Sequence, residues 1–307
     1  MDKTDAMMDI VKHIINQHFG CDAYEIGKIR NITNNSVYFF KVAGDGFFLK
    51  LYKSKEWPEE GKVPFVYQML SQNNIPCAEL IAYSRGDGTY PNGYLIERQI
   101  KGKAADKIQL ETEQETRLYI KLAELMSSVH SIRMNNYGYI GNGTADYGSM
   151  ADFLDDEFDG ISERLRDTVS EVQLKRLKEK LLDTMHDYED LPSVLCHGDL
   201  SKKNVIIRDD AEISLIDWDD AMALNWMADV SRLTFWMKQN YSEQEYALFR
   251  NVFLEHYCTS DRKARFDAFE SAYHIYATLD FLIFSRKVGN REMETHLKSC
   301  LEHYSML

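Results

Sequence analysis

The residue pattern changes character near Gly102, and this change restricts the chain to a fold with two different parts. Between residues 24 and 52, aromatic and β-branched residues dominate, and Ala43-Gly44-Asp45-Gly46 separates two such runs as a hairpin turn would. After Gly102, apolar residues recur at helical spacing in 113–132, 161–188, 243–257, 262–286 and 293–304. We therefore expect an α+β, bilobal fold with a small β-rich N-terminal lobe and a larger helical C-terminal lobe.

The boundary between the lobes is expected at a short connection rather than at a linker. Residues 97–102 join the last predicted strand of the first lobe to the helical region, and no Gly/Ser/Pro-rich tract lies nearby. A length of 307 residues is enough for two lobes with a substantial core. The predicted division is a nucleotide-binding lobe over 1–97 and a helical lobe over 98–307.

The charge is unevenly distributed and excludes some classes of partner. Lys and Arg number 36 against 49 Asp and Glu, a formal net charge of −13. Residues 1–100 contain 11 Lys and Arg and 12 Asp and Glu, a net charge of −1, so residues 101–307 carry a net charge of −12. Such a surface repels nucleic acid and anionic membranes, so neither is expected as a partner. It would attract cations.

The cysteines and the hydropathy pattern indicate a cytoplasmic protein. The cysteine count of five is odd and no Cys-x-x-Cys pair occurs, which favours free thiols in a reducing compartment. No apolar run approaches the length of a membrane-spanning helix, and the first residues lack the apolar core of a signal peptide.

One non-helical island, 193–218, interrupts the helical region and carries the chemistry. It contains His197-Gly198-Asp199, then Asn204 five residues after the aspartate, a short strand, a polar turn, a second strand and Asp217. The hairpin is expected to bring Asp217 back beside Asn204. A loop carboxylate that can accept a proton, together with two oxygen ligands, meets the needs of Mg²⁺-assisted phosphoryl transfer. The alternative is a polar hairpin whose Asp and Asn cap turns.

These motifs resemble those of the aminoglycoside phosphotransferase family and its small-molecule kinase relatives, such as choline kinases. The resemblance covers about residues 20 to 290 and implies a protein-kinase-like fold and Mg²⁺-dependent transfer from ATP (or GTP) to a hydroxyl of a small molecule. It makes Asp199 the catalytic base and Asn204 and Asp217 the metal ligands. Asp229 would brace the catalytic loop, or else serve as a helix N-terminal carboxylate. His130 and His197 are interpreted as structural.

The N-terminal lobe should hold the nucleotide. Lys50 lies in an apolar strand, where a lysine faces either solvent or a phosphate, and the resemblance implies the phosphate. The loop 31–36 lacks glycine, but Asn34, Asn35 and Ser36 and their backbone amides could cover the phosphates. No P-loop motif occurs. The backbone of Arg98 and Ile100, in the inter-lobe connection, is expected to hydrogen-bond adenine; an ordinary strand end is the alternative.

The sequence departs from the family at the acid that pairs with the strand lysine. That acid should lie on the next helix near Val63, where none is present. Glu59 and Glu60 stand just upstream, and Glu60 is the residue we select.

The acceptor site is expected in the acidic lobe, and three functional classes compete. The run Asp152-Phe153-Leu154-Asp155-Asp156-Glu157-Phe158-Asp159 could contact a cationic acceptor or form a solvated helix face. Asp219 and Asp220 could line the cleft or bind a second Mg²⁺. The first hypothesis is a small-molecule kinase, and the second is a degenerate kinase fold that binds nucleotide or a partner without turnover. A protein kinase is disfavoured because Asp217-Trp218-Asp219 replaces Asp-Phe-Gly and no Gly-rich loop is present.

Overall fold

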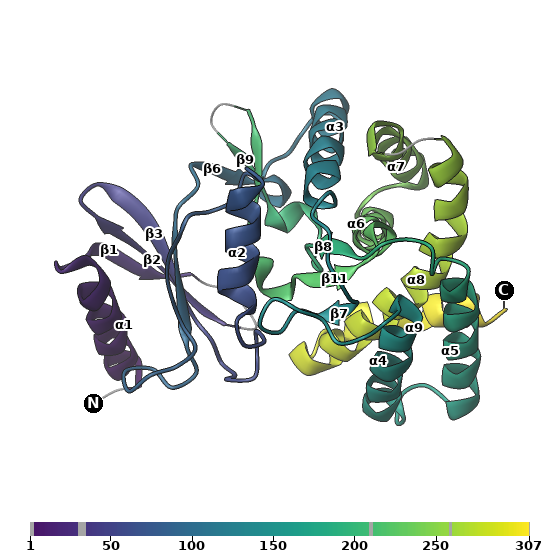
Figure 1. Cartoon of the computed structure of the whole chain (residues 1–307), viewed down its shortest axis with the longest axis horizontal. Helices are drawn as coiled ribbons and strands as arrows, with labels where there is room; N and C mark the ends of the chain where they lie inside the picture. The colour runs from purple at the N-terminus through teal and green to yellow at the C-terminus, as the bar shows by residue number, and fades with distance from the viewer. Residues whose placement is uncertain (1–2, 30–34, 209–210, 258–259, 307) are drawn as a thin grey trace. The chain divides into compact units, whose positions relative to one another are not determined.

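A computed structural model describes residues 3–29, 35–208, 211–257 and 260–306, and the chain forms two compact units (Figure 1). The smaller unit comprises Met1–Lys107, Gly141–Gly143 and Val205–Asp219. The larger unit comprises Ile108–Ile140, Thr144–Asn204 and Asp220–Leu307. A small antiparallel-sheet lobe and a helical lobe are thus present, which confirms the predicted α+β, kinase-like fold class.

The smaller unit is built on a five-stranded antiparallel sheet of order β1-β2-β3-β5-β4. Its strands are β1 Tyr24–Lys28, β2 Ser36–Val42, β3 Asp45–Leu51, β4 Leu80–Ser84 and β5 Tyr94–Arg98. The β2–β3 hairpin closes on the pair Val42↔Asp45, as the sequence predicts. Its turn works because Ala43 and Gly44 both take positive φ, 50° and 94°.

Two helices flank this sheet. Helix α1, Lys3–Phe19, lies beside β2 and β3 (Figure 1) and buries Val11, Ile14 and Ile15 in one core with Phe40 and Phe47. Helix α2, Lys62–Gln72, follows Gly61, whose φ of 72° places it in the left-handed region. The buried apolar stripe of α1 fixes this helix to the sheet.

The smaller unit also contains the hairpin of the non-helical island, Val205–Asp219. The predicted division into 1–97 and 98–307 places this segment in the helical lobe. Strand β6, Gly102–Ala104, pairs with β9, Val205–Arg208, which pairs with β10, Ile213–Leu215. Gly102 has φ 144°, and a Cβ there would lie 2.3 Å from the Ile207 carbonyl oxygen. Ladder hydrogen bonds thus join segments about a hundred residues apart, which no local sequence pattern reveals.

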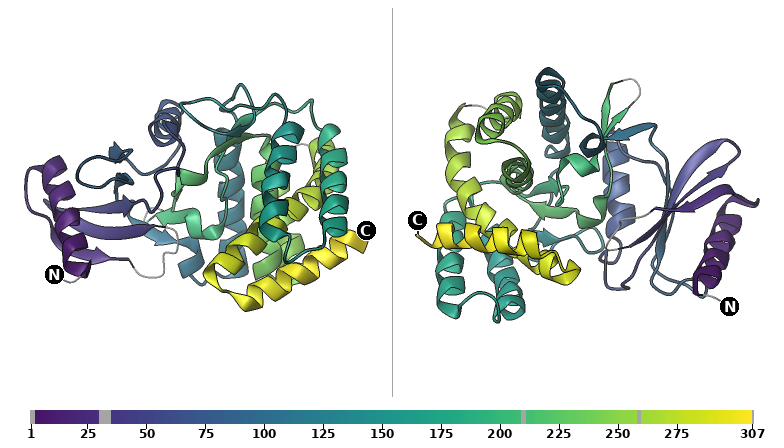
Figure 2. Two further views of the ribbon diagram at one scale, coloured as in Figure 1. Left: turned by 90° about the horizontal axis from the view of Figure 1, so that it is seen from below. Right: turned by 180° about the vertical axis from the view of Figure 1, so that it is seen from behind.

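The larger unit is mostly helical. Its helices are α3 Thr112–Val129, α4 Met150–Leu165, α5 Glu171–His186, α6 Trp226–Asn240, α7 Glu243–Tyr257, α8 Ser260–Val288 and α9 Arg291–Met306. A small sheet of order β7-β11-β8 consists of Gly138–Tyr139, Met222–Leu224 and Val194–Cys196. In Figure 2, α4 and α5 (teal) run side by side, as do α8 and α9 (yellow).

Side-chain caps explain where several of these helices begin. The predicted helical stretch 161–188 is in fact the end of α4 followed by α5, because Ser170 accepts a hydrogen bond from Gln173 N–H and starts a new helix. Ser149 caps α4 and Asn225 caps α6 in the same way.

The described residues include free thiols, and none of their helices is suited to cross a membrane. Cys21, Cys77, Cys196 and Cys300 are unpaired, while Cys258 lies outside the described residues. Over the ranges described, none of the helices combines the length and apolarity that a membrane span requires.

Candidate active site

The catalytic loop of the larger unit follows the buried strand β8. Its tight turn depends on Gly198, which has φ 79° and whose Cβ would lie 1.8 Å from the Asp220 carbonyl oxygen. Any side chain here would force the loop and the segment at Asp220 apart. The loop thus fixes the backbone immediately before Asp199.

A buried carboxylate braces this loop from helix α6. Asp229 accepts hydrogen bonds from His197 N–H at 2.5 Å and Gly198 N–H at 2.9 Å, and His130 Nε2 lies 3.2 Å from it. Burial alone would raise the pKa of Asp229, but its hydrogen bonds with the His130 side chain and the His197 N–H, together with electrostatic interactions with both imidazoles, hold the pKa below its ordinary value. Asp229 therefore holds the backbone of this loop at His197 and Gly198, which agrees with its predicted bracing role.

Asp199 itself has a fixed but reachable carboxylate. Its side chain is 15% exposed, and Oδ2 lies 2.8 Å from Lys203 Nζ. The buried amide Nδ2 of Asn204 donates to the Asp199 carbonyl oxygen at 2.8 Å and to Oδ2 at 3.1 Å. Two donors thus orient the carboxylate. Lys203 is not identified as a site residue by sequence reasoning, although its spacing of four residues from Asp199 could have indicated the contact.

In the smaller unit Lys50 meets two carboxylates from the end of the island. Lys50 Nζ lies 2.6 Å from Asp217 Oδ1 and 2.8 Å from Asp219 Oδ2. Burial would lower the pKa of Lys50, but the two carboxylates outweigh it and raise the pKa well above its ordinary value. Lys50 is therefore a fixed cation and not a surface lysine.

Asp217 adopts a backbone conformation that few residues tolerate. Its φ is 67°, in the left-handed region, and its side chain is 45% exposed. Strained conformations of this kind are concentrated at functional sites. The conformation turns the chain sharply directly after β10 and leaves the carboxylate half-exposed beside Lys50.

The donor set fits the magnesium ion that the fold family implies. Asn204 uses its amide nitrogen on Asp199, and no described residue donates a hydrogen bond to its Oδ1. Asp217 adds a half-exposed carboxylate. Amide and carboxylate oxygens are the ligand types that Mg²⁺ prefers. Considered within its own unit, each side chain offers an oxygen suited to a hard cation.

The other predicted nucleotide contacts also lie in the smaller unit. Ser36 begins β2, and Asn35 Oδ1 accepts a hydrogen bond from Lys53 N–H at 3.4 Å, while Asn34 lies outside the described residues. The N–H of Arg98 is taken by the Glu79 carbonyl oxygen, whereas that of Ile100 has no partner among the described residues. Ile100 is thus the better placed of the two to donate to a base.

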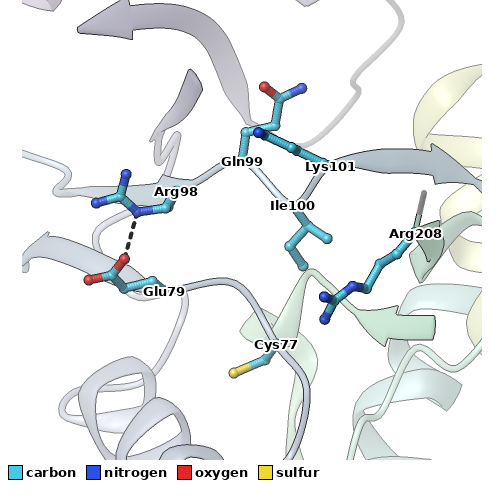
Figure 3. A pocket seen from close by; sticks show the side chains of 7 residues that line it. All are labelled: Cys77, Glu79, Arg98, Gln99, Ile100, Lys101 and Arg208. Atoms are coloured by element: carbon cyan, nitrogen blue, oxygen red, sulfur yellow. Dashed lines mark hydrogen bonds and ion pairs between the residues drawn. The ribbon is translucent and has the colours of Figure 1, made fainter. Parts of the chain in front are cut away.

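A cavity of about 480 Å³ runs along this connection (Figure 3). It is lined by Cys77, Glu79, Arg98, Gln99, Ile100, Lys101 and Arg208. Figure 3 shows the Ile100 side chain directed toward Cys77 and Arg208, with Gln99 on the other side of the chain. Glu79 Oε2 holds Arg98 Nε at 2.6 Å.

Glu60 does not contact Lys50 in this structure. It stands before α2, where its carbonyl oxygen accepts a hydrogen bond from Asn142 N–H. The carboxylates that pair with Lys50 are those of Asp217 and Asp219. The sequence identifies the missing helix acid but not the residue beside Lys50.

The acidic run on α4 is mostly paired, with one exception. Asp155 and Asp159 both contact Lys178, and Asp156 accepts a hydrogen bond from Tyr147. Glu157 instead lies on the buried side, where Tyr139 Oη donates to it at 2.8 Å and Tyr276 Oη lies 3.5 Å away. Burial raises the pKa of Glu157, against the hydrogen bond from Tyr139.

A buried arginine on α6 pairs with an aspartate of α8. The buried Arg232 lies 3.1 Å from Asp280 Oδ2, and its Nε has no hydrogen-bond partner in the described structure. Burial would lower its pKa, but Asp280 raises it, and Asp199 is among the further charges that do so. Sequence reasoning missed Arg232, although a lone arginine three residues after Asp229 in an apolar stretch is a usable signal.

Comparison with known proteins identifies several solved structures with a similar fold. The chain is similar to a thermostable mutant of aminoglycoside phosphotransferase APH(4)-Ia in ternary complex with AMP-PNP and hygromycin B (TM-score 0.75, 20% identity, 96% of this chain and 98% of that chain). It is also similar to choline kinase LicA from Streptococcus pneumoniae (0.66, 13%, 98% and 99%). A third is the GDP and kanamycin complex of APH(2")-IIia (0.65, 14%, 96% and 98%). No curated protein sequence matches.

These identities establish the fold, and a family model goes further. The model described as the phosphotransferase enzyme family matches residues 26–269, which include Lys50, the catalytic loop and Asp229. The match covers most of the sequence and every described site residue discussed above except Asp280 and Tyr276. The chain therefore belongs to the phosphotransferase enzyme family.

Proposed function

We propose that the protein transfers the terminal phosphoryl group of ATP to a hydroxyl group of a small cationic molecule. The observation that carries the proposal is the oriented carboxylate of Asp199, held by Asn204 on a loop that Asp229 braces. A family phosphotransferase needs a carboxylate at this point of the chain to receive the acceptor proton.

Asp199 would accept the proton of the acceptor hydroxyl while the hydroxyl oxygen forms a bond to the γ-phosphorus of ATP. The bond from that phosphorus to the bridging oxygen breaks, and ADP leaves with the electron pair. Lys50 contributes a permanent positive charge toward the phosphates. Asn204 and Asp217 would hold Mg²⁺, which when bound neutralises phosphate charge.

Support for the nucleotide comes from the smaller unit. The N–H of Ile100, which has no partner among the described residues, offers a donor to a purine, and Arg98, Asn34, Asn35 and Ser36 remain the other proposed contacts. Some of the similar aminoglycoside phosphotransferase structures are complexes with AMP-PNP, ADP or GDP, so ATP is the first donor to test and GTP the second.

Support for a cationic acceptor comes from the charges in the larger unit. Arg232 pairs with Asp280, whereas the hydrogen bonds that Glu157 accepts from described residues come from the phenols of Tyr139 and Tyr276, and Arg164 interacts with it electrostatically. Because Tyr139 and Tyr276 add aromatic surface beside Glu157, an ammonium group would find both a carboxylate and π faces here. The net charge of −12 over 101–307 acts in the same direction.

The test is Mg²⁺-dependent ADP release across aminoglycosides, choline-like amines and neutral sugars. We expect a cationic compound to stimulate release, and Asp199→Ala to abolish the stimulation while ATP still raises the melting temperature. Glu302→Ala, which removes an exposed carboxylate on α9, is the matched control and should behave as the parent. Unchanged turnover in Asp199→Ala would refute the mechanism. ATP binding without turnover on any acceptor would instead support the degenerate binding module.

A further inference from the structure

Helix α2 cannot supply the carboxylate that normally positions the phosphate-binding lysine. Its sequence over Lys62–Gln72 contains neither Asp nor Glu. The first helical position is instead Lys62, which is fully buried, pairs with Glu59 and lies 4.2 Å from the centre of the Trp57 ring. A second cation thus stands where the partner acid of Lys50 is expected.

Asp219 lies at the centre of the polar contacts that surround Lys50. Its Oδ2 lies 2.8 Å from Lys50 Nζ, and its Oδ1 accepts a hydrogen bond from Tyr52 Oη at 3.1 Å. Its carbonyl oxygen accepts a hydrogen bond from Lys62 Nζ at 3.2 Å. All four residues belong to the smaller unit, so the network is complete within one compact body.

The two carboxylates beside Lys50 differ in solvent exposure, which suits one of them to hold the lysine and the other to bind an ion. The Asp219 side chain is 6% exposed and both of its oxygens are engaged, whereas the Asp217 side chain is 45% exposed. A buried carboxylate with two fixed donors is a poor candidate for an incoming ion, because an ion would have to displace both. Asp217 can change partners while Asp219 stays in place.

We infer that Asp219 is the positioning residue for Lys50, replacing the absent acid on α2 and holding the ammonium where the nucleotide phosphates bind. The inference rests on the proposed function. It assigns Asp219 to the lysine and not to a second Mg²⁺. It also explains how Lys62 is tolerated in the core, since its Nζ donates a hydrogen bond to the Asp219 carbonyl oxygen and forms an ion pair with Glu59.

The experiment compares the affinities of ATP and adenosine, each measured with Mg²⁺ and with EDTA. Adenosine lacks phosphates, so it reports on the base site alone. We expect Asp219→Asn to weaken ATP binding about tenfold or more, as when a charged hydrogen bond is lost, with adenosine unchanged and the loss present in EDTA. Lys50→Met should reproduce the loss, and Asp219→Asn should add little to it.

Two further variants keep the test decisive. Tyr52→Phe removes only the hydroxyl that fixes Asp219 Oδ1, so it should lower ATP affinity less but in the same selective way, even if Asp219→Asn fails to fold. Glu25→Gln removes an exposed carboxylate that pairs with Lys41 and is the matched control.

Three outcomes would overturn the inference. The first is an unchanged ratio of ATP to adenosine affinity in both Asp219→Asn and Tyr52→Phe. The second is a loss confined to Mg²⁺, which would make Asp219 a metal ligand. The third is a double variant in which the losses of ATP affinity caused by Asp219→Asn and by Lys50→Met add up in full. If the parent protein binds ATP but phosphorylates nothing, the proposed function fails and this inference still stands or falls on the binding ratio.

Discussion

His274 makes the larger unit sensitive to acid at the helix that carries Asp229 and Arg232. It lies on α8, is buried, and its Nε2 is 3.1 Å from the Ser231 carbonyl oxygen and 3.2 Å from Thr234 Oγ1, both on α6. Burial lowers its pKa to about 4, with Lys238 and Arg250 acting in the same direction and Glu270 opposing them. The ordinary value is 6.5.

The sign of the effect follows from the two pKa values. The folded pKa is lower than the unfolded one, so between about pH 6.5 and 4 the unfolded chain binds more protons. The stability that the neutral imidazole provides is therefore present at pH 8 and is lost as the pH falls through this range. At pH 5 the loss from His274 amounts to about 2 kcal/mol, and below pH 4 it levels off near 3 kcal/mol.

Urea unfolding at pH 8 and pH 5 measures this directly. Glutamine at 274 can still donate to the Ser231 carbonyl oxygen but does not titrate. The parent should therefore lose about 2 kcal/mol more than His274→Gln between the two pH values. His13→Gln, which changes an exposed histidine on α1, should follow the parent. Equal losses in the parent and in His274→Gln would refute the reasoning, since all other titrating groups are shared.

Two further predictions concern the catalytic loop and the acceptor. Gly198→Ala should cost about 1–2 kcal/mol from its left-handed backbone alone, plus the clash with Asp220, and should reduce turnover more than ATP affinity. Gly27→Ala, where a Cβ would meet nothing within 4 Å, should change neither turnover nor melting temperature. Because burial raises the pKa of Glu157, the KM for a cationic acceptor should fall as the pH rises through that pKa, while the KM for ATP stays constant. Steady-state kinetics from pH 5 to 7 would reveal this trend, and a trend that persists in Glu157→Gln would contradict it.

Much of the fold can be predicted from sequence because local patterns are strong in the smaller unit. The β2–β3 hairpin is visible in its aromatic runs and turn residues. Helix α6 is not visible, because it is buried on nearly all sides and has no polar face to give a period. The pairing of β6 with β9 is also invisible, since it joins residues distant along the chain.

In the site, too, local spacing can be predicted from the sequence, whereas contacts between distant segments cannot. Asp199 and Asn204 lie five residues apart on one loop, so their spacing already predicts a common role. Lys50 and Asp219 are separated by 169 residues, and nothing in the sequence around Asp219 indicates that its carboxylate is buried. The sequence shows that α2 lacks an acidic partner for Lys50, but it does not show which residue replaces that partner, because burial is decided by tertiary packing.

The left-handed backbone of Asp217 restricts which residues can replace it during evolution. Glycine, asparagine and aspartate are the residues that adopt this conformation readily. Single-base changes convert an aspartate codon into one for glycine or for asparagine. One point mutation can therefore remove the carboxylate without straining the turn after β10. Under the proposed function, a single substitution at Asp217 would thus give a protein that binds nucleotide without turnover, and its fold would give no sign of the loss.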